Sequence, residues 1–145
     1  LRHQLAHHNS LLAETAKNAG VVESRDYAIF QNHGYKGLYG GLDAKDIHAR
    51  KGLKKSQKIL DHMGTTELAA NLFRATQAED KLRRENIKGK RNANQTHFEV
   101  GKKVRKTIEE LGGAMPEDLP VADSIKHLES KEQRLLKDKK EEWGE

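Results

Sequence analysis

Hydrophobic residues recur along this chain mainly at spacings of three and four residues, the period of an α-helix that buries one face. The pattern is clearest over residues 65–85, where Leu68, Leu72 and Leu82 fall on one side of the expected helix. No stretch alternates apolar and polar residues for more than a few positions, as a half-buried strand would. The pattern therefore predicts an all-α fold.

Glycines and capping residues divide the pattern into separate helices. A first helix is expected to end before Gly20, and Ser24 is placed to cap a short second helix. This second helix should stop before residues 34–41, because the glycines in that stretch disfavour helical backbone. Asp43 is placed to cap a third helix that runs to about Arg50.

The second half of the chain is predicted to contain three further helices. One spans residues 53–63, and Gly64 closes it. The next is the strongly periodic segment over residues 65–85. A polar loop rich in lysine, asparagine and glycine is expected over residues 87–95, before a last long helix that ends at Gly112.

Together these elements predict one compact domain of about five to seven helices, since 145 residues suit a single hydrophobic core. We expect this domain to cover residues 1–115, with a glycine-rich corner at 34–41. Residues 116–145 are expected to form a linker followed by a charged C-terminal helix or tail. Because the chain starts at Leu1, inside a helical pattern, we expect a natural N-terminal portion to precede it.

The composition excludes several classes of site. The chain has no cysteine, which excludes disulfides, thiolate metal sites and thiol catalysis. No apolar run approaches the length of about 18 residues that a membrane span needs, and the start does not resemble a signal peptide. We therefore expect a cytoplasmic protein without a membrane partner.

Charge is unevenly distributed along the chain. From Lys81 to Lys106, ten basic residues stand against two acidic ones, whereas eleven acidic residues outnumber six basic ones from Thr107 to Glu145. A basic segment of this kind favours contact with a polyanion, although folding can also bring the two charged segments together.

Many of the basic residues have a carboxylate one helical turn away, which partly neutralises them. The expected in-helix pairs are Glu79 with Arg83, Asp80 with Arg84, Lys81 with Glu85, Glu99 with Lys103, Arg105 with Glu109, and Lys106 with Glu110. The basic residues that lack such a partner are the predicted contacts with phosphate or with an acidic protein surface. They are Arg50, Lys51, Lys54, Lys55, Lys58, Lys88, Lys90 and Arg91. The alternative is that these charges only keep the domain soluble.

The glycine-rich stretch raises the question of phosphate binding, since backbone N–H groups of such loops can hold a phosphate. It matches neither the P-loop nor the dinucleotide-binding pattern. We therefore interpret its glycines as residues of a tight corner or of a close helix approach. Tyr35 and Tyr39 are expected to hold this corner against the core rather than to stack on bases.

No catalytic residue, cofactor, small-molecule substrate or metal site is predicted. His3 and His7 lie one helical turn apart but lack a nearby third ligand. The chain contains no motif for nucleophilic catalysis and no metalloprotease motif. A nuclease whose metal-binding carboxylates come from separate helices is the enzymatic alternative.

Long segments of the chain carry a family resemblance. They are YAIFQNHGYKGLYGGL (27–42), GLKKSQKILDHMG (52–64), TELAANLFRATQ (66–77), THFEVGKKVR (96–105) and ELGGAMP (110–116). These segments resemble the bacterial DNA damage-inducible protein D (DinD) family, and the match extends from the first helix to roughly Leu128. The tail beyond Leu128 departs from the family pattern.

The resemblance implies a protein that is induced in the SOS response to DNA damage, with a BRO-type domain upstream of the segment present here. It implies action on the RecA recombinase filament on single-stranded DNA, as a modulator that inhibits or dismantles it. It implies no catalytic residues. The first hypothesis is therefore a binding module, not an enzyme, whose partner is the RecA nucleoprotein filament. The second is a DNA-binding or antirepressor-like regulator that acts directly on single-stranded DNA or other nucleic acid.

Overall fold

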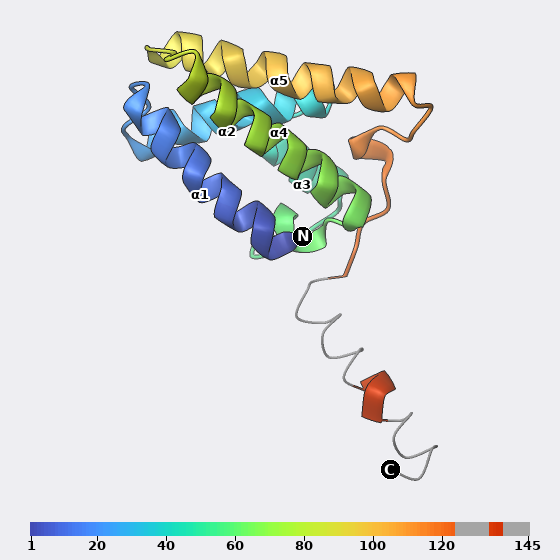
Figure 1. Ribbon diagram of the computed structural model, residues 1–145. Helices are drawn as coiled ribbons and strands as arrows, with labels where there is room; N and C mark the ends of the chain where they lie inside the picture. The colour runs from blue at the N-terminus through green and yellow to red at the C-terminus, as the bar shows by residue number, and fades with distance from the viewer. Residues whose placement is uncertain (124–133, 138–145) are drawn as a thin grey trace.

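The computed structural model describes residues 1–123 and 134–137 of the chain (Figure 1). Over residues 1–123 it contains five α-helices and no strand, so the predicted all-α fold is confirmed. The helices are α1 (Arg2–Asn18), α2 (Ser24–Leu38), α3 (Ala44–Arg50), α4 (Thr65–Arg84) and α5 (Lys90–Glu110). Two short 3₁₀ turns, η1 (Ile59–His62) and η2 (Pro116–Asp118), lie in the connecting segments.

The four long helices pack in pairs. α1 lies along α4, α2 lies along α5, and α4 also contacts α5 (Figure 1). The main core fills the space between these helices, and its largest buried apolar side chains include those of Leu5, Leu12, Phe30, Met63 and Leu82. A second apolar cluster holds α3 against α2 and α5, and it contains Tyr35, Leu38, Tyr39, Ile47 and Val104.

The bundle has two distinct ends. α1 and α4 run in the same direction, because Arg2 bonds to Asp61 just before α4 and Thr15 bonds to Glu79 near its end. We call the end that holds residues 39–64 and 111–122 the near end. The opposite end, which holds the turns at 19–23 and 85–89, is the far end; there the Gly89 N–H donates to the Ala19 carbonyl.

The prediction that the second helix stops before the glycine-rich stretch is wrong. α2 begins at Ser24, without a side-chain cap, and continues through Gly34 and Gly37 to Leu38. A Cβ on Gly34 would lie 2.2 Å from the His97 ring, and one on Gly37 would lie 2.3 Å from the Phe98 carbonyl oxygen of α5. The close approach of α2 and α5 therefore requires these glycines within the helix.

The predicted helix over residues 53–63 is also wrong, since only the η1 turn forms there. Side chains satisfy the backbone of this segment instead. The Gln57 side chain accepts from the Lys54 N–H at 2.7 Å, and His48 Nε2 lies 3.0 Å from each of the Lys54 and Gln57 carbonyl oxygens. These contacts hold the segment as an irregular loop.

Two other boundaries can be compared with the sequence. The Asp43 cap of α3 is confirmed, as a capping box with Asp46. The polar loop expected over residues 87–95 is shorter than predicted, because α5 already begins at Lys90. Gly89 precedes it with a φ of +95°, a conformation that favours glycine.

Residues 116–122, predicted as a linker, contact the near end of the bundle. Pro116 is buried, and the Ala122 N–H and carbonyl both bond to His62. The predicted C-terminal helix or tail lies outside the described residues, except for 134–137, which are helical.

Candidate interaction site

The eight basic residues predicted as contacts lie in two groups at opposite ends of the bundle. The near end holds Arg50, Lys51, Lys54, Lys55 and Lys58, and the far end holds Lys88, Lys90 and Arg91. α4 spans the distance between the ends, and its 20 residues extend over about 30 Å. The eight residues therefore do not form one compact patch.

Three lysines lie together in the loop between α3 and η1 at the near end. Lys54, Lys55 and Lys58 are all exposed. Within the part of the chain that the structure describes, no carboxylate lies within ion-pair distance of their ammonium groups. The predicted nearby acid, Asp61, bonds to Arg2 instead, at 2.6 Å. We call these three residues the lysine loop.

Two basic residues of the near end have partners that the sequence did not reveal. The ammonium group of Lys51 lies 2.7 Å from a carboxylate oxygen of Glu67, and both side chains are buried. Arg50 pairs with Asp118 at 2.7 Å. The sequence analysis considered only partners one helical turn away, and these two partners come from other elements of the fold.

At the far end, Lys90 pairs with Asp26 of α2 at 2.9 Å, so its partner also comes from another element of the fold. This hydrogen bond raises the pKa of Lys90 and is the main cause of the lowered pKa of Asp26. Lys88 donates to the Asn18 carbonyl at 3.1 Å. Arg91 is exposed and has no ion pair within the described residues.

The in-helix pairs were predicted well in α4 and poorly in α5. Glu79 with Arg83, Asp80 with Arg84, and Lys81 with Glu85 are confirmed. In α5, however, Arg105 does not pair with Glu109 as predicted. Its two terminal nitrogens bind the two carboxylate oxygens of Glu117, at 2.7 and 2.8 Å. This bond is the main cause of the raised pKa of Arg105.

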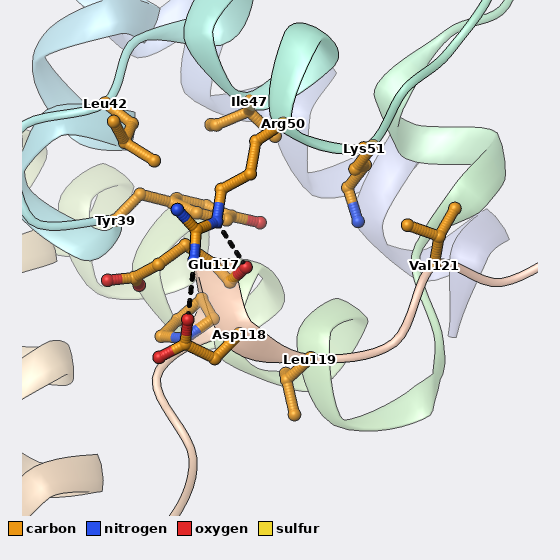
Figure 2. A pocket seen from close by; sticks show the side chains of 10 residues that line it. Tyr39, Leu42, Ile47, Arg50, Lys51, Glu117, Asp118, Leu119 and Val121 are labelled. Carbon is orange, nitrogen blue, oxygen red and sulfur yellow. Dashed lines mark hydrogen bonds and ion pairs between the residues drawn. The ribbon is translucent and has the colours of Figure 1, made fainter.

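A cavity of 330 Å³ lies beside this contact, between α3 and residues 116–121 (Figure 2). Arg50 reaches across it to Glu117 and Asp118, while Leu42 and Ile47 form part of its apolar wall. Tyr39 lines it as well. The cavity therefore combines paired charges with apolar surface.

A buried polar network connects the near end with the centre of the bundle. Glu67 accepts a hydrogen bond from the Tyr39 hydroxyl as well as from Lys51. Asn71 donates to Tyr39 at 3.0 Å and accepts from Arg74 at 3.2 Å. The ring hydroxyl of Tyr39 stays protonated, since burial and the Glu67 charge raise its pKa. The network thus joins α2, α4 and the end of α3.

Arg74 and His97 complete this network inside the core. Both are fully buried, and the Arg74 guanidinium donates to His97 Nε2 at 2.6 Å. His97 Nδ1 in turn donates to the Phe30 carbonyl at 2.8 Å, and its ring stacks on Phe30. Burial, helped by the Arg74 charge, holds the pKa of His97 well below 6.5.

Sequence reasoning missed this network, although a signal was present. Glu67, Asn71 and Arg74 follow one another at spacings of four and three residues, so they share one face of α4. They lie next to the apolar face of the same helix and are buried with it. Polar residues at helical spacing beside an apolar face therefore indicated a wider buried face.

An apolar groove runs between α4 and α5 towards the near end. Its volume is 410 Å³, and its lining includes Ala70, Phe73, Ile108 and Leu111. Phe73 is 50% exposed and Leu111 is 80% exposed, and both lie on this one groove, so they form part of a continuous apolar patch. The groove therefore offers apolar surface to a partner.

Neither metal-binding clusters nor membrane-spanning helices are found in the part of the chain that the structure describes. His3 and His7, the pair considered from the sequence, are exposed on α1. His62 is buried, and its Nδ1 bonds to the Ala122 carbonyl at 2.9 Å.

The comparisons with known proteins concern nearly the whole chain. The chain is 66% identical over 131 residues to the DNA damage-inducible protein D of Escherichia coli (strain K12). This alignment covers 90% of the chain and 48% of that protein, so the chain spans about half the length of this relative. No solved structure matches the chain. The model of the family described as the DinD C-terminal domain matches residues 1–128. The chain therefore belongs to the DinD C-terminal domain family.

Proposed function

We propose that this chain is a binding module of the bacterial DNA-damage response that modulates the RecA recombinase filament on single-stranded DNA. Membership of the DinD C-terminal domain family supports the damage-response role, as does the name of the 66% identical relative, a DNA damage-inducible protein. In this proposal the chain acts by binding and not by catalysis. The proposal includes a cytoplasmic location, because recombinase filaments assemble on chromosomal DNA.

The observation that carries the proposal is the lysine loop. Lys54, Lys55 and Lys58 present three ammonium groups within five residues, and none of them is neutralised within the described chain. Unpaired lysines attract a polyanion with their full charge, and they do so without reading a base sequence. This behaviour suits a partner that coats DNA of any sequence.

The placement of the basic residues also favours an extended partner. The lysine loop and Arg91 lie at opposite ends of α4, about 30 Å apart given its 20 residues. A small ligand cannot contact both ends at once, whereas a filament can. The exposed apolar groove near Phe73 and Leu111 further favours a protein surface over naked nucleic acid, because phosphate-dominated interfaces are polar.

Co-sedimentation tests the proposal. The chain is incubated with RecA filaments preformed on single-stranded DNA, and separately with the same DNA without RecA. We expect the chain to pellet with the filaments and to remain mostly in the supernatant with naked DNA. Equal binding to naked DNA would instead favour a regulator that acts directly on nucleic acid. An absence of binding to both would contradict the proposal.

A further inference from the structure

Two arginines from different helices hold one acidic turn at the near end. Arg105 of α5 binds both carboxylate oxygens of Glu117, at 2.7 and 2.8 Å. Arg50, the last residue of α3, donates to Asp118 at 2.7 Å and to the main-chain carbonyl of Glu117 at 2.8 Å (Figure 2). We call Arg50 and Arg105 the arginine pair. It recognises two adjacent carboxylates and the peptide backbone between them.

The bundle itself positions Arg105. Its guanidinium donates to the Leu38 carbonyl at 3.2 Å and packs against Gly40. A Cβ on Gly40 would lie 2.8 Å from the central carbon of the guanidinium, and the φ of +66° at Gly40 also favours glycine. The glycine-rich corner therefore makes room for the arginine. Arg105 therefore has contacts with the bundle that do not involve the acidic turn.

The cavity beside the arginine pair indicates which kind of anion fits. Leu42 and Ile47, which belong to the bundle and not to the acidic turn, contribute apolar side chains to its lining. A peptide can fill such a surface with its own side chains, whereas a phosphodiester strand is polar along its whole backbone. The hydrogen bond from Arg50 to a main-chain carbonyl likewise suits a peptide.

We propose that the arginine pair is a receptor for an acidic segment of a partner protein, and that residues 116–118 occupy it as an internal competitor. Only the identity of the partner rests on the proposed function. A segment tethered so closely has an effective concentration of about millimolar or more. A partner must displace it, so the affinity of the wild-type chain is reduced by the fraction of molecules whose site is open.

The test uses a peptide in place of the internal segment. The probe is the amidated peptide GAMPEDLPVA with a neutral fluorophore on its N-terminus, and it has the sequence of residues 113–122. Its binding is measured by fluorescence anisotropy and by NMR of the arginine Nε–H signals. The variant Glu117→Ala/Asp118→Ala removes the internal carboxylates. The charge-matched control is Glu14→Ala/Glu110→Ala, since both of these glutamates are exposed.

We expect the variant without internal carboxylates to bind the peptide at least about tenfold more tightly than the wild type and the control do. Arg50→Gln in the same background should reverse the gain and should remove the peptide-induced shift at Arg105. Urea unfolding verifies that each variant is folded. A gain as large in the control, or a gain that survives Arg50→Gln, would overturn the proposal.

A parallel titration with an oligothymidylate tests whether the arginine pair instead binds the phosphate groups of nucleic acid. Tighter oligonucleotide binding without tighter peptide binding would show a phosphate site and would overturn the assignment to a peptide. Neither titration contains RecA, so their failure is separate from a failure of filament binding.

Discussion

The close approach of the α2 and α5 backbones at Gly37 makes the substitution Gly37→Ala a sharp test of the fold. A Cβ at this position would lie 2.3 Å from the Phe98 carbonyl oxygen and 2.8 Å from the Lys102 backbone nitrogen. Both atoms belong to the backbone of α5, so no side-chain rotation relieves the overlap. The two helices must move apart.

The expected magnitude follows from two opposing effects. Overpacking of a tight interface destabilises a protein by about 1–3 kcal/mol. The upper part of this range applies, because separating the helices also loosens contacts such as the stacking of Phe30 on His97. Alanine is favoured over glycine within a helix by about 1 kcal/mol. We therefore expect Gly37→Ala to lower the free energy of unfolding by about 2 kcal/mol.

Urea unfolding followed by circular dichroism measures this effect. Gly113→Ala is the control, because its Cβ would lie 3.3 Å from an Ile108 side-chain methyl and 3.5 Å from the Ile108 carbonyl oxygen, which is far less overlap than at Gly37. We expect the control to change stability by less than about 0.5 kcal/mol. If Gly37→Ala is as stable as the wild type, the helices do not approach as closely as described.

Three further predictions concern the buried charges and the absence of catalysis. Lys51→Ala should lower the free energy of unfolding by about 3–5 kcal/mol, because it leaves the buried Glu67 carboxylate without its cation. Lys54→Ala should have almost no effect in the same urea experiment. Unfolded His97 takes up a proton near pH 6.5, whereas the folded ring stays neutral to well below that pH. Stability should therefore fall below pH 6.5, by up to about 1.4 kcal/mol per pH unit, and His97→Asn should remove this part of the pH dependence. Finally, labelled DNA incubated with the chain and magnesium should show no more cleavage than a chelated control, and cleavage above it would refute a purely binding role.

The helices that the sequence predicted well are those in which local and tertiary preferences agree. α4 combines a regular apolar period with good helix-forming residues, and Asp43 caps α3 through a local hydrogen bond. The predicted second helix ended too early, because Gly34 and Gly37 lower helix propensity. Their use in packing against α5 is a tertiary contact that a local pattern does not contain.

The ion pairs likewise depend on tertiary contacts that a local sequence pattern does not contain. Setting aside the basic residues that have a carboxylate one helical turn away identifies neutralised charges only where both members of an ion pair lie in one helix, as in α4. Arg50 and Asp118 are 68 residues apart in the sequence, and Lys51 and Glu67 are 16 apart. Because the fold creates these pairs, the sequence overstated the number of free cations. The three residues of the lysine loop, together with Lys88 and Arg91, are the members of the predicted set that have no ion-pair partner in the described structure.

The central claim is that the lysine loop binds the recombinase filament, and co-sedimentation of two triple variants tests it most directly. The first is Lys54→Gln/Lys55→Gln/Lys58→Gln. The second is Lys81→Gln/Arg83→Gln/Arg84→Gln, which removes the same charge from residues that already have carboxylate partners in α4. Both should keep wild-type stability, since exposed charges contribute little to folding. We expect the first to bind RecA filaments at least about tenfold more weakly and the second to bind nearly as the wild type does. Equal loss in both, or loss only in the second, would contradict the account.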